Sequence, residues 1–383
     1  GSIIKVNLIR EEVNTEETFA KSAIIDLNEE LYNIGYIYLP KFYSSFEDGG
    51  NSCAIDVAKE INKLKNENVN GIILDLRNNS GGSLSDVVDM TGLFIESGPI
   101  VQVKGRESKP YINRDKDPNV QFDGPLIIMV NQFSASASEI IAAAIQDYGR
   151  GVIVGSTTFG KGTVQRFYEI DRFISGKEEL KPFGSLKITT QKFFRVNGGS
   201  TQHKGVVPDI TLPDIYRYMD YGEKEYEYGL AYSEINAVPY KQNVVVLENI
   251  PTLIENSRKR VEKHKEFNLI EENALLRKKN KDLSVYPLSF EEYKNFVAKR
   301  EAEYDKFKDM FSNSIQNLKI KNPKADLSSL EEASRKARND EWVKGLQKDI
   351  YLEETMFIMR DMIKSEKSLA AFTKGLNSNE IKN

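Results

Sequence analysis

Residues 125–140 read Pro125-Leu-Ile-Ile-Met-Val-Asn-Gln-Phe-Ser-Ala-Ser-Ala-Ser-Glu-Ile140. The first six residues are a continuous apolar run followed by polar ones, which is typical of a strand buried on both faces of a parallel sheet. Residues 138–148 then predict a helix. A strand followed closely by a helix is the repeating unit of an α/β fold.

The same pattern recurs on both sides of this stretch. Residues 71–76 form another short apolar run, and residues 83–95 predict the helix that follows it. Residues 35–40 and 152–154 predict further strands, and the apolar spacing within residues 53–64 predicts a helix. We therefore predict an α/β core in which right-handed crossovers join the strands of a central sheet flanked by helices.

The flanking regions have a different character. Residues 163–170 and 184–196 alternate polar and β-forming residues, which predicts antiparallel hairpins. After Pro213 the chain is rich in Glu, Lys, Asn and Leu with helical periodicity, so residues 216–383 are interpreted as a charged helical cap. At its residues 289–292, Ser-Phe-Glu-Glu is a capping-box pattern. Residues 3–10 alternate and predict a strand that requires a sheet to pair with.

Composition excludes several classes of protein. Lys and Arg number 53 against 57 Asp and Glu, so the chain lacks the basic excess of a dedicated nucleic-acid-binding protein. No apolar run approaches the ~18 residues that span a bilayer. The single cysteine excludes an internal disulfide bond, a pattern found in both cytosolic and periplasmic proteins. No signal peptide is visible, and because Gly1-Ser2 is typical of a cloning remnant, we expect the natural protein to begin upstream.

Ser136 is the first candidate for chemistry. It lies where the strand at 125–130 gives way to a helix, at the carboxyl edge of the predicted sheet, where α/β active sites usually occur. The free N–H groups of the first helical turn would lie beside its hydroxyl and could stabilise an oxyanion. The alternative is that Ser134, Ser136 and Ser138 only cap the helix, and of the three Ser138 is the predicted cap.

Lys161 is the candidate base for this serine. It lies in the loop Gly155-Ser-Thr-Thr-Phe-Gly-Lys161-Gly-Thr-Val-Gln165. A serine hydroxyl needs a base to become a nucleophile, and a lysine can serve if burial keeps it neutral. The chain has only two histidines, and we interpret His203 as an exposed loop residue rather than the base. The sequence therefore predicts a Ser–Lys hydrolase.

A phosphate-binding loop is the rival interpretation of Lys161. The spacing nearly matches such a loop, but the position that should be Ser or Thr is Gly162. A phosphate loop must also open a helix, whereas residues 163–170 predict a strand. We therefore expect no nucleotide site here.

Three further positions could support the dyad. Gly81 and Gly82 follow the strand at 71–76, where paired glycines allow positive φ and a second oxyanion donor, or merely a tight turn. Gln165 would share a strand face with Lys161 and could orient its amine. Asp147 ends the predicted serine-bearing helix and is interpreted as structural, binding nearby backbone or Arg150.

Several of these motifs together resemble the tail-specific, or C-terminal processing, serine proteases, specifically their long branch. Outside the serine and lysine segments, the resemblance rests on Asp75-Leu-Arg-Asn-Asn-Ser-Gly-Gly, Gln146-Asp-Tyr-Gly149, Gln191-Lys-Phe-Phe-Arg-Val-Asn-Gly-Gly-Ser-Thr-Gln202 and Lys204-Gly-Val-Val-Pro-Asp209. It covers residues 15–215 closely and the helical tail loosely. It implies a fold related to crotonase and the Clp-type proteases.

The resemblance also implies roles for particular residues. Ser136 would be the nucleophile, Lys161 the general base and Gln165 the residue that orients it. The backbone N–H groups of Gly82 and Ala137 would bind the oxyanion. Neither a metal nor another cofactor is implied.

The resemblance further implies an endopeptidase of the bacterial periplasm that recognises protein substrates by their apolar C-terminal tails, with an adaptor lipoprotein as a possible partner. Residues 1–14 would be the last strand of an upstream PDZ domain, 15–215 the Ser–Lys protease core and 216–383 a helical C-terminal domain. Because a PDZ domain delivers substrate in this family, the alternatives are a latent protease or a non-catalytic scaffold or tail-binding module.

Overall fold

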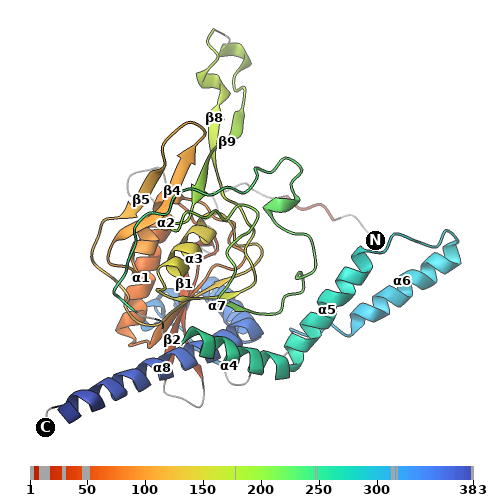
Figure 1. Ribbon diagram of the computed structural model, residues 1–383. Helices are drawn as coiled ribbons and strands as arrows, with labels where there is room; N and C mark the ends of the chain where they lie inside the picture. Colours follow the sequence, from red (N-terminus) through yellow and green to blue (C-terminus); the bar gives the residue numbers. More distant parts are fainter. Residues whose placement is uncertain are drawn as a thin grey trace.

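The computed structural model in Figure 1 describes residues 4–7, 18–27, 32–44, 52–176, 178–245, 247, 249–311, 315 and 318–380, with side chains to residue 365. The strands are β1 (Lys21–Leu27), β2 (Asn33–Tyr38), β3 (Gly71–Asp75), β4 (Gly98–Gly105), β5 (Tyr111–Asp115), β6 (Leu126–Val130), β7 (Val152–Gly155), β8 (Thr163–Glu169), β9 (Ser185–Phe194), β10 (Ile210–Thr211) and β11 (Leu318–Lys321). The α-helices are α1 (Cys53–Asn66), α2 (Leu84–Gly92), α3 (Ala137–Asp147), α4 (Ile250–Lys263), α5 (Lys265–Lys281), α6 (Phe290–Asp305), α7 (Ala333–Leu346) and α8 (Ile350–Glu380).

A seven-stranded sheet forms the centre of the molecule, in the order β10-β7-β6-β3-β2-β1-β11. The strands from β10 to β2 run parallel, and β1 and β11 are antiparallel to their neighbours. All five residues of β3 and all five of β6 are buried, as their continuous apolar runs predicted. The predicted α/β core with a central sheet is confirmed.

Helices cover both faces of this sheet, because alternate side chains of each buried strand point to opposite sides. On one face, Ile128 of β6 shares a core with Ile141 of α3 and Val57 of α1. On the other face, Ile127 shares a second core with Met356 of α8. The C-terminal region therefore supplies one of the two layers that bury the sheet.

A second sheet, in the order β5-β4-β9-β8, is antiparallel throughout. Its strands β8 and β9 form the hairpin that projects from the body of the molecule in Figure 1. This pairing confirms the predicted strands at 163–170 and 184–196. The strand after Lys161 also removes the phosphate-loop interpretation, which requires a helix there.

The C-terminal region departs from the predicted helical cap in two ways. It contributes β11, which pairs with β1 through Ile25 and Ile320 at the edge of the central sheet. It also begins with residues 216–245, which contain one short 3-10 helix and otherwise no regular structure. Ser289 occupies the predicted N-cap of α6, but its side chain makes no capping hydrogen bond.

The predicted strand at 3–10 is only partly described. Residues 4–7 are not in a strand, and Ile4 and Val6 are exposed, because these residues have no sheet partner in the described part of the chain. The rest of that prediction lies outside the described residues. No helix in the described ranges combines the length and apolar composition needed to cross a membrane.

Candidate active site

Ser136 lies in the turn between β6 and α3, as predicted, and is the N-cap residue of that helix. Its backbone has φ 57° and ψ −111°, a combination that a residue with a side chain rarely adopts. Such strain costs about 1–3 kcal/mol and persists only where the surroundings enforce it. The side chain is half-buried, so the strained turn presents a hydroxyl group that solvent can reach.

The two flanking serines hold this turn in place. The Oγ of Ser134 donates to the carbonyl of Leu76 at 2.8 Å and accepts from the backbone N–H of Asn131 at 2.9 Å. The Oγ of Ser138 donates to the carbonyl of Asn79 at 2.8 Å. The prediction that Ser138 caps the helix is therefore wrong, because its hydroxyl binds the neighbouring loop instead.

Gly81 and Gly82 lie directly against the serine turn. They have φ values of 98° and 150°, which glycine adopts at little cost. A Cβ on Gly81 would lie 2.7 Å from Cβ of Ser136 and 3.0 Å from the nitrogen of Ala137, and one on Gly82 would lie 1.9 Å from the carbonyl oxygen of Phe42. Within the described residues, the N–H groups of Gly82 and Ala137 donate no hydrogen bond. Both donors are thus available beside Ser136.

Lys161 follows Gly160, which has φ 88°, in the loop between β7 and β8. Its Nζ donates to Oε1 of Gln165 at 3.4 Å, and Nε2 of Gln165 donates to Oγ1 of Thr189 on β9 at 3.4 Å. The glutamine therefore lies beside the lysine, as predicted, but not through a shared strand face, because Lys161 precedes β8 and the register of β8 shifts between Val164 and Gln165. Both hydrogen bonds are long, so they orient the amine loosely.

The pKa of Lys161 is lowered, first by burial and then by the positive charge of Lys187, while Glu223 acts in the opposite direction. A lowered pKa increases the fraction of neutral amine, which is the form that can accept a proton. Within the described residues, no hydrogen bond joins Nζ of Lys161 to Oγ of Ser136. The structure therefore brings the two segments together without forming the proton-transfer contact.

Glu139 connects the two segments, a role that the sequence analysis missed. It is fully buried, and its Oε2 accepts from the backbone N–H groups of Ser136 at 2.8 Å and Lys161 at 2.9 Å. Its Oε1 accepts from Oγ1 of Thr158 and from the N–H of Gly160, each at 2.7 Å. Burial nevertheless raises the pKa of Glu139 to about 7. One carboxyl group thus fixes the spacing between the predicted nucleophile and the predicted base.

A second buried side chain, Gln202, supports the lysine loop from the other side. Its Oε1 accepts from the N–H of Gly162 at 2.8 Å, and its Nε2 donates to the carbonyl of Leu230 at 2.8 Å. The neighbouring His203 is not the exposed loop residue that the sequence predicted. It is half-buried at φ 64°, its N–H donates to the carbonyl of Gly160, and its buried Nε2 makes no hydrogen bond in the described part of the chain.

Comparison with known proteins places the chain among known families. The sequence profile of peptidase family S41 matches residues 33–212, and that of the C-terminal domain of tail-specific protease matches residues 216–364. Residues 33–212 belong to peptidase family S41. The S41 region contains both predicted catalytic residues, and the second region contains the segment that approaches Gln202.

Named relatives agree with this assignment. The tail-specific protease of Haemophilus influenzae is 38% identical over 304 residues, which are 79% of this chain and 41% of the relative. The carboxy-terminal processing protease CtpA of Bacillus subtilis is 31% identical over 263 residues, 64% of this chain and 52% of the relative. The chain thus spans about half the length of these relatives. A solved photosystem II D1 C-terminal processing protease is 24% identical, with a TM-score of 0.44 and coverage of 53% of this chain and 50% of that one.

Asp147 lies at the opposite end of α3 from Ser136. Its side chain is 6% exposed and accepts two hydrogen bonds from Arg195, at 3.0 and 2.6 Å, and one from Asn197 at 2.8 Å. Arg150, one of the two alternatives predicted as a partner of Asp147, donates to the backbone carbonyls of Phe94 and Phe122. The structural interpretation of Asp147 fits this ion pair between the end of α3 and the segment after β9.

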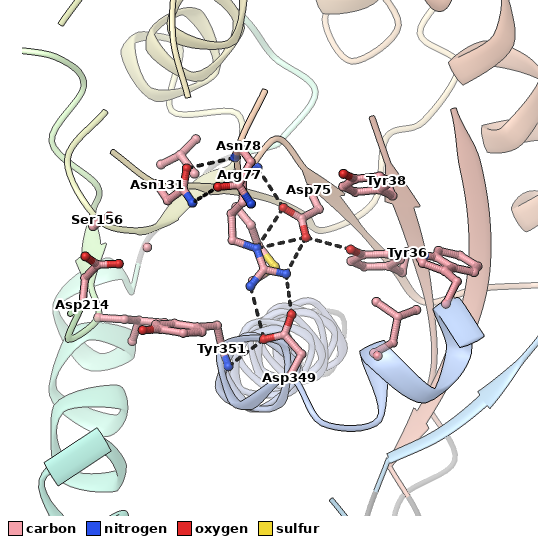
Figure 2. A pocket seen from close by; sticks show the side chains of 17 residues that line it. Tyr36, Tyr38, Asp75, Arg77, Asn78, Asn131, Ser156, Asp214, Asp349 and Tyr351 are labelled. Atoms are coloured by element: carbon pink, nitrogen blue, oxygen red, sulfur yellow. Dashed lines mark hydrogen bonds and ion pairs between the residues drawn. The ribbon is translucent and has the colours of Figure 1, made fainter. Parts of the chain in front are cut away.

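A cavity of about 460 Å³ lies at the same edge of the sheet, on the side covered by α7 and α8. Figure 2 shows that Asp75, Arg77 and Asp349 meet in its wall. Neither Ser136 nor Lys161 of the S41 region lines it. Within the described ranges, no group of three His, Cys, Asp or Glu side chains is placed to hold a metal ion.

Proposed function

We propose that this chain is the catalytic part of a serine endopeptidase in which Ser136 is the nucleophile and Lys161 the general base. Its substrates are proteins recognised at apolar C-terminal tails. The names of the relatives, tail-specific and carboxy-terminal processing proteases, support this substrate class. We further propose a periplasmic location and an adaptor lipoprotein as partner, which cell fractionation and co-purification would test.

The proposed reaction is acyl transfer. Neutral Lys161 takes the proton from Oγ of Ser136, and the oxygen attacks the scissile carbonyl carbon. The N–H groups of Gly82 and Ala137 bind the carbonyl oxygen as it becomes negative. Lys161 then gives its proton to the leaving amine, which leaves an ester on the serine. Lys161 next activates the water that hydrolyses this ester.

The observation that carries the proposal is the pair of unbonded N–H groups beside a strained serine. Ala137 is buried, and buried backbone donors are almost always paired, so its free N–H indicates an acceptor that arrives with the substrate. Gly82 is exposed, so its free N–H is open to the same acceptor. In the described residues no hydrogen bond joins Ser136 to Lys161, which is the observation behind one alternative, a latent protease. In apo enzymes catalytic hydrogen bonds are often long and tighten only in the substrate complex.

Cleavage of an unfolded test protein that ends in an apolar tail tests the proposal. We expect the chain to cut this protein and its Ser136→Ala variant to leave it intact, because the variant lacks the attacking oxygen. A second substrate whose tail ends in charged residues should be cut more slowly. Cutting by both variants would overturn the role of Ser136. Cutting by neither would favour the latent protease or the non-catalytic alternative.

The pH dependence of kcat/KM should move in opposite directions in two charge variants. Activity should rise with pH as Lys161 loses its proton. Lys187→Gln removes a positive charge that lowers the pKa of Lys161, so its profile should shift to higher pH. Glu223→Gln removes a negative charge that raises the same pKa, so its profile should shift to lower pH. Two shifts in the same direction, or none, would contradict a lysine base.

A further inference from the structure

An ion cluster lies at the carboxyl end of β3, on the face of the sheet away from α3. Nε of Arg77 donates to both carboxylate oxygens of Asp75 at 3.0 Å, and its Nη2 donates to Asp75 Oδ2 at 2.6 Å. The same guanidinium donates to Asp349 from Nη1 at 3.2 Å and from Nη2 at 2.5 Å. The hydroxyl of Tyr36 donates to Asp75 at 2.7 Å. Figure 2 shows Arg77 held between the two carboxylates.

This cluster joins parts of the chain that are far apart in sequence. Asp349 immediately precedes α8 and caps it, because its Oδ1 accepts from the N–H groups of Tyr351 and Leu352 at 3.0 Å each. The helix is anchored below the sheet, where Met359 lies against Gly71 at the start of β3. The carboxylate of Asp349 is therefore a fixed point supplied by the C-terminal region.

Arg77 also belongs to the short segment that connects β3 to Gly81 and Gly82, which we call the oxyanion turn. Its own N–H donates to Asp75 at 2.9 Å, which sets the turn after β3. Two residues later, the carbonyl of Asn79 accepts from the N–H of Ala135 at 3.0 Å, and its Oδ1 accepts from the N–H of Gly81 at 2.9 Å. Hydrogen bonds therefore fix most of the segment between Arg77 and Gly82.

We propose that Asp349 is a positioning residue for the peptidase reaction, which acts through Arg77 to hold the oxyanion turn at Gly82 against the serine turn. This inference rests on the proposed function for its effect on rate. Its structural half, the control of the turn by the C-terminal region, stands independently of that function.

Charge and burial support the coupling. The side chains of Arg77 and Asp349 are each 17% exposed and that of Asp75 is 2% exposed. A charge removed from water this far depends on its partners, and removing one leaves the others poorly compensated. Loss of Asp349 would leave Arg77 with one carboxylate partner instead of two. The N–H groups that bind Asp349 would then bind other acceptors, and the segment that carries Arg77 would shift with them.

The experiment compares Asp349→Asn with Asp361→Asn in the full chain. Asparagine at 349 keeps a side-chain oxygen that can cap α8 but loses the negative charge that binds Arg77. Asp361 is a matched control on the same helix, because it is 13% exposed and pairs with Arg260 of α4. It does not contact the segment between Asp75 and Gly82.

Two readouts are required. The first is amide hydrogen exchange in residues 77–83, which should become faster in Asp349→Asn and remain unchanged in Asp361→Asn. The second is kcat, which should fall about 10-fold or more in Asp349→Asn with KM little changed, because small displacements of catalytic groups cost this much or more. The control should keep kcat even where its melting temperature falls.

Each outcome decides one point. Unchanged exchange in residues 77–83 with unchanged kcat would overturn the coupling. Equal losses of kcat in both variants would also overturn it, since a general loss of stability would then explain the result. Faster exchange in Asp349→Asn, together with no protein cleavage by the wild-type chain, would keep the coupling and reject the proposed function.

Discussion

Replacing either Ser136 or Lys161 by alanine is expected to lower kcat by roughly 10⁴-fold or more, and replacing both should cost little beyond either alone. The reason is that the two residues act as a unit. The serine without its base is a weak nucleophile, and the base without the serine has no proton to accept. Single-turnover rates of the two single variants and the double variant would measure this non-additivity.

Two control variants keep this prediction specific. Ser156→Ala and Lys192→Ala change the same residue types near the site, yet Ser156 bonds Gln132 and Lys192 bonds Ala231 and Ser233. Both variants should keep most of kcat. If the losses in Ser136→Ala and Lys161→Ala multiplied in the double variant, the residues would act in separate steps and the dyad would be rejected.

Glu139→Ala is expected to produce the second large effect, a loss of both stability and activity. The change leaves the N–H groups of Ser136, Gly160 and Lys161 without their acceptor in a buried site, and each unsatisfied group costs about 1–3 kcal/mol. It also releases the nucleophile segment from the base segment. Urea unfolding and kcat at a temperature where the variant remains folded would measure the two losses separately.

Glu60→Ala is the matched control for this change. Glu60 is also buried, at 7% exposure, and accepts from Ser22 and Lys63, which lie away from the serine and lysine loops. It should lose stability while kcat of the folded protein is retained. A Glu139→Ala variant that kept wild-type kcat would show that the carboxyl group is only structural.

The raised pKa of Glu139 adds a pH signature. It rises from 4.5 to about 7 because burial outweighs the four donors that bind the carboxyl group. The folded state therefore holds this proton more tightly than the unfolded chain. Its contribution to stability falls as the pH rises from 4.5 to about 7 and is constant above that range. The stability difference between wild type and Glu139→Gln should follow this course, and a change of the opposite sign would reject the raised pKa.

Local sequence patterns predicted most of the central sheet. Continuous apolar runs such as that of β6 have one stable location, between two layers, and the helix after each run follows from its spacing. The same reasoning missed β1, whose residues 21–27 pair with a segment near residue 320. It also missed β11, because four residues in a charged tail carry little periodicity of their own. Pairing over such sequence distances leaves no local signal.

The residues of the candidate site were likewise predicted from the sequence only in part. Ser136, Lys161, Gln165, Gly82 and Ala137 lie in recognisable motifs. The structure packs Gly81, next to Gly82, against Ser136 and Ala137, and it puts Gln165 beside Lys161. Glu139 carried the weaker signal of a charged residue in the first turn of a helix. In the folded chain its buried carboxyl group accepts from the N–H of Ser136 at the start of α3 and also from the N–H groups of Gly160 and Lys161 in the lysine loop. A hydrogen-bonding role of this kind depends on partners contributed by another segment.

The sequence by itself determined the alternation of buried strands and helices in the core and the match to peptidase family S41, and it predicted the reactive groups, because these follow from residue types and short spacings. Only the tertiary structure decided what holds those groups. A buried carboxyl or guanidinium is stable only where distant segments supply its hydrogen bonds. Thus Glu139 joins the serine and lysine loops, and Arg77 joins the oxyanion turn to Asp349 at the start of α8.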